Sequence, residues 1–212
     1  MTGTEKLILR GAAPADAGAL AVLHRDAFPE FFLSSLGTAF LKQFYLGFAG
    51  DVSAISTVAQ RPDGAIVGSI VGTTEPDGFF SRLLRSRLLP FALISARESI
   101  RRPRIIPRLL RAVRYRGEAG VRVDGALLSS ICVRSDQQGQ GTGRLMMEHW
   151  ERSAASSGAT LAYLTTDAER NDGVNAFYRR RGWELASNYR TPEGRSMNVY
   201  TKSLTDSKEN LT

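Results

Sequence analysis

Residues 127–150 read LLSSICVRSDQQGQGTGRLMMEHW, and this stretch decides the fold. Its first residues form part of an apolar run, residues 126–133, which has the length of a strand. A polar turn follows, and then three glycines at alternate positions, Gly139, Gly141 and Gly143. From Thr142 the apolar residues recur at helical spacing. The pattern therefore predicts a strand, a glycine turn and a helix, whose first free N–H groups form a site for a phosphate.

The spacing of the glycines distinguishes between kinds of phosphate-binding loop. A Walker loop requires Lys-Ser or Lys-Thr after its last glycine, whereas Gly143 is followed by Arg144 and Leu145. A dinucleotide-binding fold requires G-x-G-x-x-G in an early βαβ unit, whereas this strand comes late and the spacing is G-x-G-x-G. The pattern that matches is Q/R-x-x-G-x-G/A, at residues 138–143 after Val133. For these six residues alone, a plain glycine-rich turn is the alternative.

A second segment, residues 171–183, reads NDGVNAFYRRRGW and follows another apolar run at 160–165. It is similar to N-x-x-A-x-x-F-Y-x-x-x-G-F, with Val174 in place of the alanine and Trp183 in place of the last phenylalanine. Together the two segments resemble the GCN5-related N-acetyltransferase (GNAT) superfamily over about residues 126–186. The resemblance implies an α/β fold with a mixed, mostly antiparallel central sheet flanked by helices.

The resemblance also implies acetyl-CoA as co-substrate. The N–H groups of the glycine loop would bind its pyrophosphate, and the main chains of Ile131 and Val133 would bind the pantetheine arm. Asn171 would bond the cofactor near the pantetheine, and a helix cap is its alternative role. The cofactor-binding residues expected are Ile131, Cys132, Val133, Gln138, Gly139, Gln140, Gly141, Thr142, Gly143, Arg144 and Asn171.

Tyr178 is the expected catalytic residue, a general acid that protonates the leaving thiolate. Successive helical residues point about 100° apart, so one of Phe177 and Tyr178 enters the core. We expect Phe177 there, which leaves Tyr178 for the site; a core aromatic is the alternative. Cys132, the single cysteine, is expected to be a small buried hydrophobe rather than a nucleophile.

The acceptor side carries a weaker signal. An aromatic loop, FPEFF at residues 28–32, follows the first predicted helix, and in the family this loop forms one wall of the acceptor site. Core filling is the alternative for its aromatic rings. By resemblance the substrate-wall candidates are Phe28, Glu30, Phe31 and Phe32.

The general base cannot be assigned from the sequence. Many relatives carry a glutamate on or near the central strand, but this strand holds no carboxylate. Glu30, Glu75 and Asp167 are possible bases, and the amine could also arrive deprotonated. His24 has no second histidine or acid at metal spacing, so we expect a packed or solvent-facing side chain and no metal site.

The 212 residues indicate one acyltransferase domain, residues 1–204, followed by a polar tail at 205–212. Strands are expected at 6–10, 52–59, 65–73, 183–188 and 197–204, and helices from Pro14 to near Pro29 and over 36–48. Asp63-Gly64 predicts a hairpin, and Gly68 and Gly72 predict bulges or close backbone approach.

Residues 77–120 depart from the family's usual plan as a helical, arginine-rich insertion between the third and fourth strands. Residues 81–118 hold eleven arginines and two glutamates, so they carry +9 while the rest of the chain totals −2. Leu84 with Leu88, and Leu109 or Leu110 with Val113, would form apolar stripes. We expect the insertion to cover the acceptor side or an oligomer contact, and a homodimer is one assembly that this allows.

These observations predict a cytoplasmic N-acetyltransferase that acts on a primary amine of a small metabolite. An amino sugar is favoured, since arginines could hold its phosphates. A protein or peptide amine, which requires an open groove, is one alternative. Another is a non-catalytic acyl-CoA-binding module whose basic insertion docks on nucleic acid or an anionic membrane. We expect no nucleic-acid partner, because the insertion has few aromatics for stacking, and no membrane span.

Overall fold

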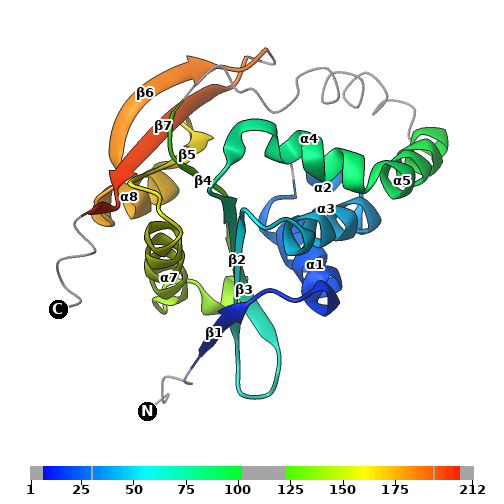
Figure 1. Ribbon diagram of the computed structural model, residues 1–212, viewed down its shortest axis with the longest axis horizontal. Helices are drawn as coiled ribbons and strands as arrows, with labels where there is room; N and C mark the ends of the chain where they lie inside the picture. The colour runs from blue at the N-terminus through cyan, green and yellow to red at the C-terminus, as the bar shows by residue number, and fades with distance from the viewer. Residues whose placement is uncertain (1–6, 30, 102–122, 193, 206–212) are drawn as a thin grey trace.

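The computed structural model describes residues 7–29, 31–101, 123–192 and 194–205, without the side chains of 32, 95 and 97–101. One sheet of seven strands, in the order β1-β2-β3-β4-β5-β7-β6, organises this part of the chain (Figure 1). The strands are β1 Ile8–Gly11, β2 Ala54–Gln60, β3 Ile66–Thr73, β4 Ala126–Val133, β5 Leu161–Asp167, β6 Glu184–Arg190 and β7 Ser196–Ser203. The α-helices are α1 Ala17–Ala27, α2 Phe32–Ser35, α3 Thr38–Gly50, α4 Pro76–Ser86, α5 Leu88–Arg101, α7 Thr142–Ser156 and α8 Asp172–Arg180. Two 3₁₀ turns lie at Pro14–Asp16 and Ser135–Gln137.

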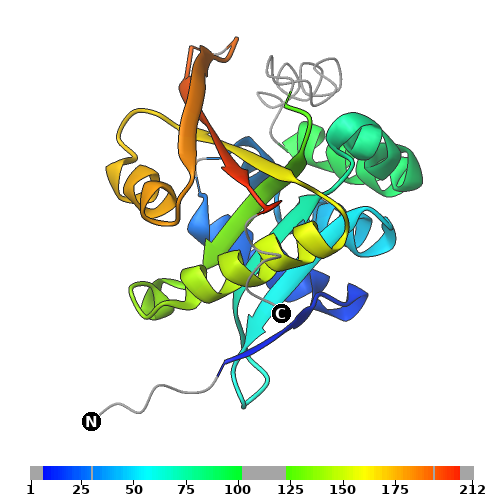
Figure 2. The ribbon, with the colours of Figure 1, turned by 60° about the vertical axis from the view of Figure 1, so that its left-hand side comes forward.

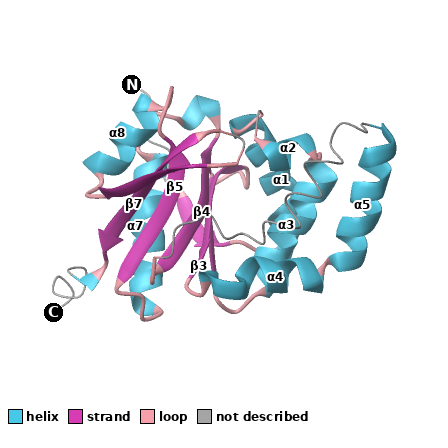
Figure 3. Cartoon of the chain, turned by 90° about the horizontal axis from the view of Figure 1, so that it is seen from above, coloured by secondary structure: helices cyan, strands magenta, loops and turns pink. Residues whose placement is uncertain are grey.

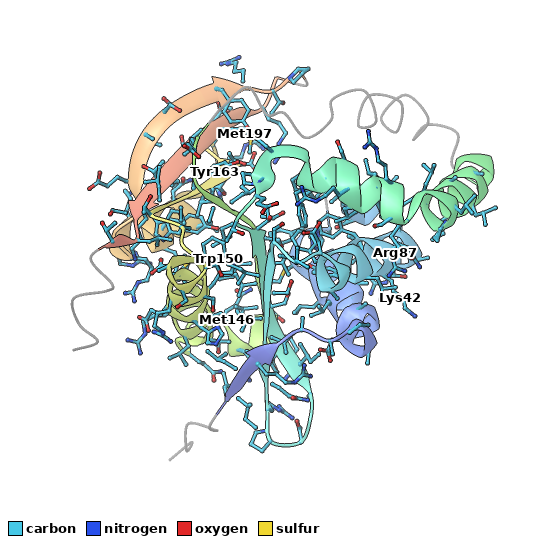
Figure 4. The ribbon with its side chains drawn as sticks, in the orientation of Figure 1. Lys42, Arg87, Met146, Trp150, Tyr163 and Met197 are labelled. Carbon is cyan, nitrogen blue, oxygen red and sulfur yellow. The ribbon has the colours of Figure 1, made fainter. Side chains whose placement is uncertain are left out.

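The two faces of the sheet carry separate hydrophobic cores. On one face α7 and α8 pack against the strands, with Met146 and Trp150 fully buried. Figure 2 shows α7 running across this face, and Figure 4 labels the two side chains. On the other face α1, α3 and α4 form the second core, in which Phe48 packs against Phe79 with ring centroids 4.7 Å apart. The predicted fold class is therefore confirmed.

The β2–β3 hairpin forms where Asp63-Gly64 predicts it, and Gly64 takes the positive φ of 89° that the turn requires. The prediction for Gly72 is also confirmed. A Cβ at Gly72 would lie 2.3 Å from the carbonyl oxygen of Leu127 and 2.5 Å from the Trp150 ring. The register between β3 and β4 shifts next to it, between Val71 and Gly72, which leaves Ser129 of β4 without a partner.

The pairing between β4 and β5 is short. These are the only parallel neighbours among the described strands, and only two register pairs connect them, Ala126 with Ala162 and Leu127 with Tyr163. Both pairs lie at the beginnings of the strands. Towards their ends the two strands separate, and Figure 3 allows both to be followed from above. The remainder of β4 therefore lacks a neighbour on its β5 side.

The described part of the insertion packs on α3, on the outer side of the second core (Figure 3). Phe91 of α5 lies 4.6 Å from Phe40 of α3 between ring centroids. The predicted stripe of Leu84 and Leu88 is wrong, because Leu88 is 62% exposed while Phe79, Leu83 and Phe91 are buried. Leu109, Leu110 and Val113, like all of residues 102–122, lie outside the described residues.

Candidate active site

The free edge of β4 presents main-chain groups to the gap beside β5. Arg134 N–H donates to the carbonyl of Val67 at 2.8 Å, so Arg134 faces β3. Successive residues of a strand direct their N–H groups to opposite edges. The N–H groups of Val133 and Ile131 consequently face the gap. This is the arrangement that the resemblance implies for a pantetheine arm, which would extend the sheet as an added strand.

The glycine loop leads directly into α7. Gly139 and Gly141 have φ of 74° and 85°, and a Cβ at either position would meet nothing within 4 Å. Gly141 is the N-cap of α7, and Leu145 N–H is the first to bond back to it, at 3.0 Å. Thr142, which opens the helix, is buried with its hydroxyl oxygen unpartnered within the described chain. Bare backbone, open space and the free N–H groups of a helix N-terminus together fit a pyrophosphate.

Side chains around the loop hold it in place. Gln138 Nε2 donates to the Val133 carbonyl at 3.2 Å, and Gln140 Nε2 donates to the Asp136 carbonyl at 2.7 Å. Arg144 is exposed near Glu148. Gly143 lies beside the ring of Phe177, and a Cβ there would be in ordinary contact with Phe177 Cζ at 3.6 Å. The structure thus brings the expected loop residues together at one end of β4.

Phe177 and Tyr178 have the reverse of the predicted orientation. Tyr178 is 6% exposed and belongs to the core beneath α7, while Phe177 is only partly buried and packs against that core. The ring of Tyr178 lies 6.2 Å from that of Trp183 and 5.8 Å from that of Tyr200. Burial raises the pKa of Tyr178, so the phenol remains protonated at neutral pH.

Asn171 occupies the N-cap position of α8, but its side chain does not cap the helix. Its Nδ2 instead donates to Thr166 Oγ1 at 2.8 Å and to the Asp167 carbonyl at 3.1 Å, at the end of β5. No hydrogen bond to its amide oxygen is found within the described residues. The helix-cap alternative is therefore wrong for the side chain, and the oxygen is left for another donor.

Asn175 was not predicted, although it lies one turn after Asn171. It is 3% exposed, and its Nδ2 donates to the Asp167 carbonyl at 2.9 Å. Its oxygen accepts from Asn198 at 2.8 Å and from the Tyr200 hydroxyl at 3.0 Å. The sequence signal that could have identified it is a polar residue at a buried position of an amphipathic helix. Asn175 fixes the ends of β5 and β7 relative to α8.

Cys132 is buried, as expected. Burial raises its pKa to about 11, so it is a thiol and not a nucleophilic thiolate at neutral pH. Its side chain faces α1 and α3, away from Ile131 and Val133, which pack towards α7. Ser130 lies on the same face, with Oγ 3.5 Å from Cys132 Sγ.

The segment after α1, which holds the predicted substrate-wall residues, meets the β6–β7 turn. Phe28 and Phe31 are 36% and 39% exposed. Arg195 forms a two-pronged ion pair with Asp167, at 2.7 and 2.8 Å, and its guanidinium lies over the Phe31 ring at 5.9 Å. The side chain of Phe32 and all of Glu30 lie outside the described residues.

The possible bases differ in what surrounds them. The Asp167 carboxylate is occupied by Arg195. Glu75 is 65% exposed at the start of α4, with Arg82 3.4 Å away. The histidine His24 is packed, 2% exposed, with Nδ1 2.9 Å from the Tyr45 hydroxyl. Three or more possible metal ligands do not cluster anywhere in the described ranges.

The family model for the acetyltransferase (GNAT) family matches residues 19–183. A search of curated proteins found no match. The similar solved structures are 12–20% identical, so they show the fold alone.

Three of these structures illustrate the range of acetyltransferases that share this fold. Naa20 from Chaetomium thermophilum, in complex with a bisubstrate analogue, is 18% identical with a TM-score of 0.59, covering 96% of this chain and 90% of its own. The ribosomal-protein-S18-alanine N-acetyltransferase from Escherichia coli is 17% identical with a TM-score of 0.56, covering 98% and 99%. An aminoglycoside 6'-acetyltransferase type Ii is 16% identical with a TM-score of 0.59, covering 93% and 97%.

No helix within the described ranges has the length and apolar character to cross a membrane. The matched residues include the free edge of β4, the glycine loop and α8. The chain belongs to the acetyltransferase (GNAT) family, and it is an acyl-CoA-dependent N-acyltransferase.

Proposed function

We propose that the protein transfers the acetyl group of acetyl-CoA directly to a primary amine of a small metabolite, in a complex that holds both substrates. The observation that carries the proposal is the unpaired edge of β4 beside the glycine loop. The N–H groups of Ile131 and Val133 face the gap, and the loop backbone is bare at Gly139 and Gly141. A donor in the gap would place its thioester beside β4 and its pyrophosphate at α7.

Two side chains and one main-chain group have proposed roles around such a donor. The oxygen of Asn171 would accept a hydrogen bond from the pantetheine arm. Tyr178 would protonate the thiolate as it leaves. A main-chain N–H on β4 would stabilise the oxyanion, a contribution of about 3–4 kcal/mol to the transition state.

The contact between Arg195, Asp167 and Phe31 supports a small acceptor. It joins the β6–β7 turn to the segment after α1, so these two boundaries of the acceptor side meet. A polypeptide acceptor requires an open groove between such boundaries. A compact amine, with an amino sugar as the favoured class, requires no such groove.

A panel of amines tests the proposal. The purified protein is mixed with acetyl-CoA and with amino sugars, polyamines, aminoglycosides or short peptides with a free N-terminus, and thiol release is measured. We expect amine-dependent release with a compact amine and only background release with peptides. Preference for a peptide would show that the acceptor is a protein amine, and background release with every amine would favour the non-catalytic binding module.

A further inference from the structure

The outer side of α5 exposes several large apolar side chains. Leu88, Leu89 and Leu93 are 62%, 75% and 71% exposed, whereas Phe91 and Ile94 of the same helix pack on the second core. No other helix or strand in the described part of the chain exposes more than one large hydrophobic residue. Single exposed leucines are normal on a protein surface, but a contiguous apolar patch indicates contact with another surface.

The exposed side chains form one continuous face of the helix. At about 100° per residue, five apolar positions fall within an arc of about 140°. We call these positions the α5 face: Leu88, Leu89, Ala92, Leu93 and Ala96. All five are exposed, and no polar or charged residue interrupts the arc among the positions of α5 whose side chains are described.

Basic side chains lie next to the α5 face. Arg85, at the end of α4, is exposed, and Arg87 joins α4 to α5. The Nη1 of Arg87 donates to Gln43 Oε1 of α3 at 3.5 Å, and the neighbouring residue on α3 is the exposed Lys42. Figure 4 labels Lys42 and Arg87 on the side of the molecule where α5 lies. An apolar helix face beside cationic side chains is typical of a helix that lies in a membrane interface.

These cations are not neutralised by acidic neighbours in the described structure. The carboxylates of Asp51 and Glu75 both pair with Arg82, at 3.0 and 3.4 Å. The ion pairs of the described residues include none for Lys42 or for the two arginines beside α5. Their charge is therefore available to an anionic partner.

Charge distinguishes between the surfaces that could cover the α5 face. Residues 81–118 carry +9, while the remainder of the chain totals −2. A second copy of the chain on a two-fold axis would bring two such basic segments together, and like charges would oppose the contact. Nucleic acid would match the charge, but its phosphates and base edges offer little to leucines. An anionic phospholipid surface matches both, because its headgroups attract arginine and its acyl chains accept leucine.

The position of α5 allows such a contact without blocking the proposed donor site. Figures 1 and 3 both show α5 on the opposite side of the molecule from α7 and α8. The glycine loop leads into α7, so a surface that covers α5 leaves the loop open to water. Membrane docking and binding of acetyl-CoA can therefore be measured separately.

We propose that the α5 face docks on the surface of an anionic phospholipid membrane, with Lys42, Arg85 and Arg87 against the headgroups. The helix would lie in the plane of the membrane, with its leucines at the boundary between headgroups and acyl chains, and would not cross the bilayer. This inference goes beyond the proposed function, because docking requires neither the acyl donor nor the amine.

Vesicle sedimentation tests the docking with the full-length protein. Vesicles of phosphatidylcholine alone are compared with vesicles of phosphatidylcholine and phosphatidylserine, at low and at high salt. The variants are Leu89→Gln/Leu93→Gln and Arg85→Gln/Arg87→Gln. The matched control is Ile8→Gln/Leu185→Gln, whose residues are 52% and 50% exposed on the edge strands β1 and β6.

We expect the wild type to sediment with the phosphatidylserine vesicles alone, and less at high salt, because salt screens the attraction. The leucine variant should bind roughly tenfold more weakly or worse, since it loses apolar burial. The arginine variant should also lose roughly tenfold or more, since it loses two charges near the surface. The control should bind like the wild type.

Three results with the vesicles would overturn the inference. They are no binding of the wild type to either kind of vesicle, equal binding to both kinds, and a leucine variant that binds as tightly as the wild type. Sedimentation velocity without vesicles supplies a fourth: a dimer of the wild type that the leucine variant does not form would assign the α5 face to a second copy.

The response to acetyl-CoA shows whether the variants are folded. Because the replaced leucines are exposed, the melting temperature of the leucine variant and its rise with acetyl-CoA should match the wild type. If the double variant does not fold, Leu89→Gln alone carries the test, because Leu89 is the most exposed leucine of the face. Failure of the docking leaves the amine-dependent release of thiol unchanged, so the two proposals fail separately.

Discussion

Single glycines decide whether the loop before α7 can accept a phosphate. Replacing Gly141 by Glu places a side chain and a negative charge in the space that a pyrophosphate would occupy. We expect acetyl-CoA to raise the melting temperature of the wild type and to have no such effect on Gly141→Glu. Differential scanning fluorimetry with and without acetyl-CoA measures this.

Backbone strain needs a separate control, because Gly141 has a positive φ. Gly158, at the other end of α7, has a φ of 94° and equally open surroundings. Gly158→Glu should therefore lose similar intrinsic stability but keep its response to acetyl-CoA. Equal ligand responses in the two variants would remove the loop from the proposed donor site.

Tyr178 provides a second test at one position. Tyr178→Phe keeps the ring between Trp183 and Tyr200 and removes only the hydroxyl. We expect acetyl-CoA affinity to stay near the wild-type value and kcat to fall by roughly 10²–10⁴-fold. The loss should shrink with an acyl donor whose thiol is more acidic, because that thiolate needs less protonation. Full turnover by the variant, where chemistry limits the rate, would assign Tyr178 to packing alone.

The orientation of Tyr178 shows what the sequence could not supply. Helical geometry fixes the angle between Phe177 and Tyr178, but the core that receives one of them comes from Trp183 and Tyr200, elsewhere in the chain. The contact of Arg195 with Asp167 could likewise not be predicted from the sequence, because 28 residues separate the partners. Local pattern specified the glycine loop well because all its residues are consecutive.

At the level of whole elements, local patterns predicted most boundaries closely. Residues 126–133 form β4 as expected, and α7 begins at Thr142. The helix expected over 36–48 instead begins at Thr38, after a short α2 that ends at Ser35. Gly37 causes the break, since its φ of 87° is incompatible with a helix.

The β3–β4 pair allows an element to be perturbed without touching the proposed site. Gly72→Ala would place its Cβ 2.3 Å from a backbone oxygen of β4, which cannot move aside like a side chain. We expect the free energy of unfolding to drop by about 1–3 kcal/mol, the usual cost of overpacking. Chemical denaturation measures the change.

Gly173→Ala is the matched control for that substitution. Gly173 lies in the first turn of α8, and a Cβ there would meet nothing within 4 Å. Because alanine favours helix over glycine, this variant should be as stable as the wild type or slightly more stable. Equal stability of the two variants would show that β3 and β4 adjust to the added methyl group.

The molecule as a whole consists of two sheet segments that share a small boundary. Strands β1 to β4 carry α1, α3 and the insertion, while β5, β7 and β6 carry α8 (Figure 1). The family resemblance predicted the mixed sheet flanked by helices, but not its division into two segments. It did not predict how α4 and α5 pack on α3, since the family plan has no counterpart for them.

Because β4 pairs with β5 only briefly, a donor bound as proposed would be a structural component of the enzyme. An extended arm bonded along the free edge of β4 would continue the sheet where the chain itself stops. Within the described chain, β4 and β5 are joined by two register pairs. A bound donor would add hydrogen bonds along the rest of β4 and so restrain the relative tilt of the two segments. We therefore expect acetyl-CoA to bind before the amine in the proposed reaction.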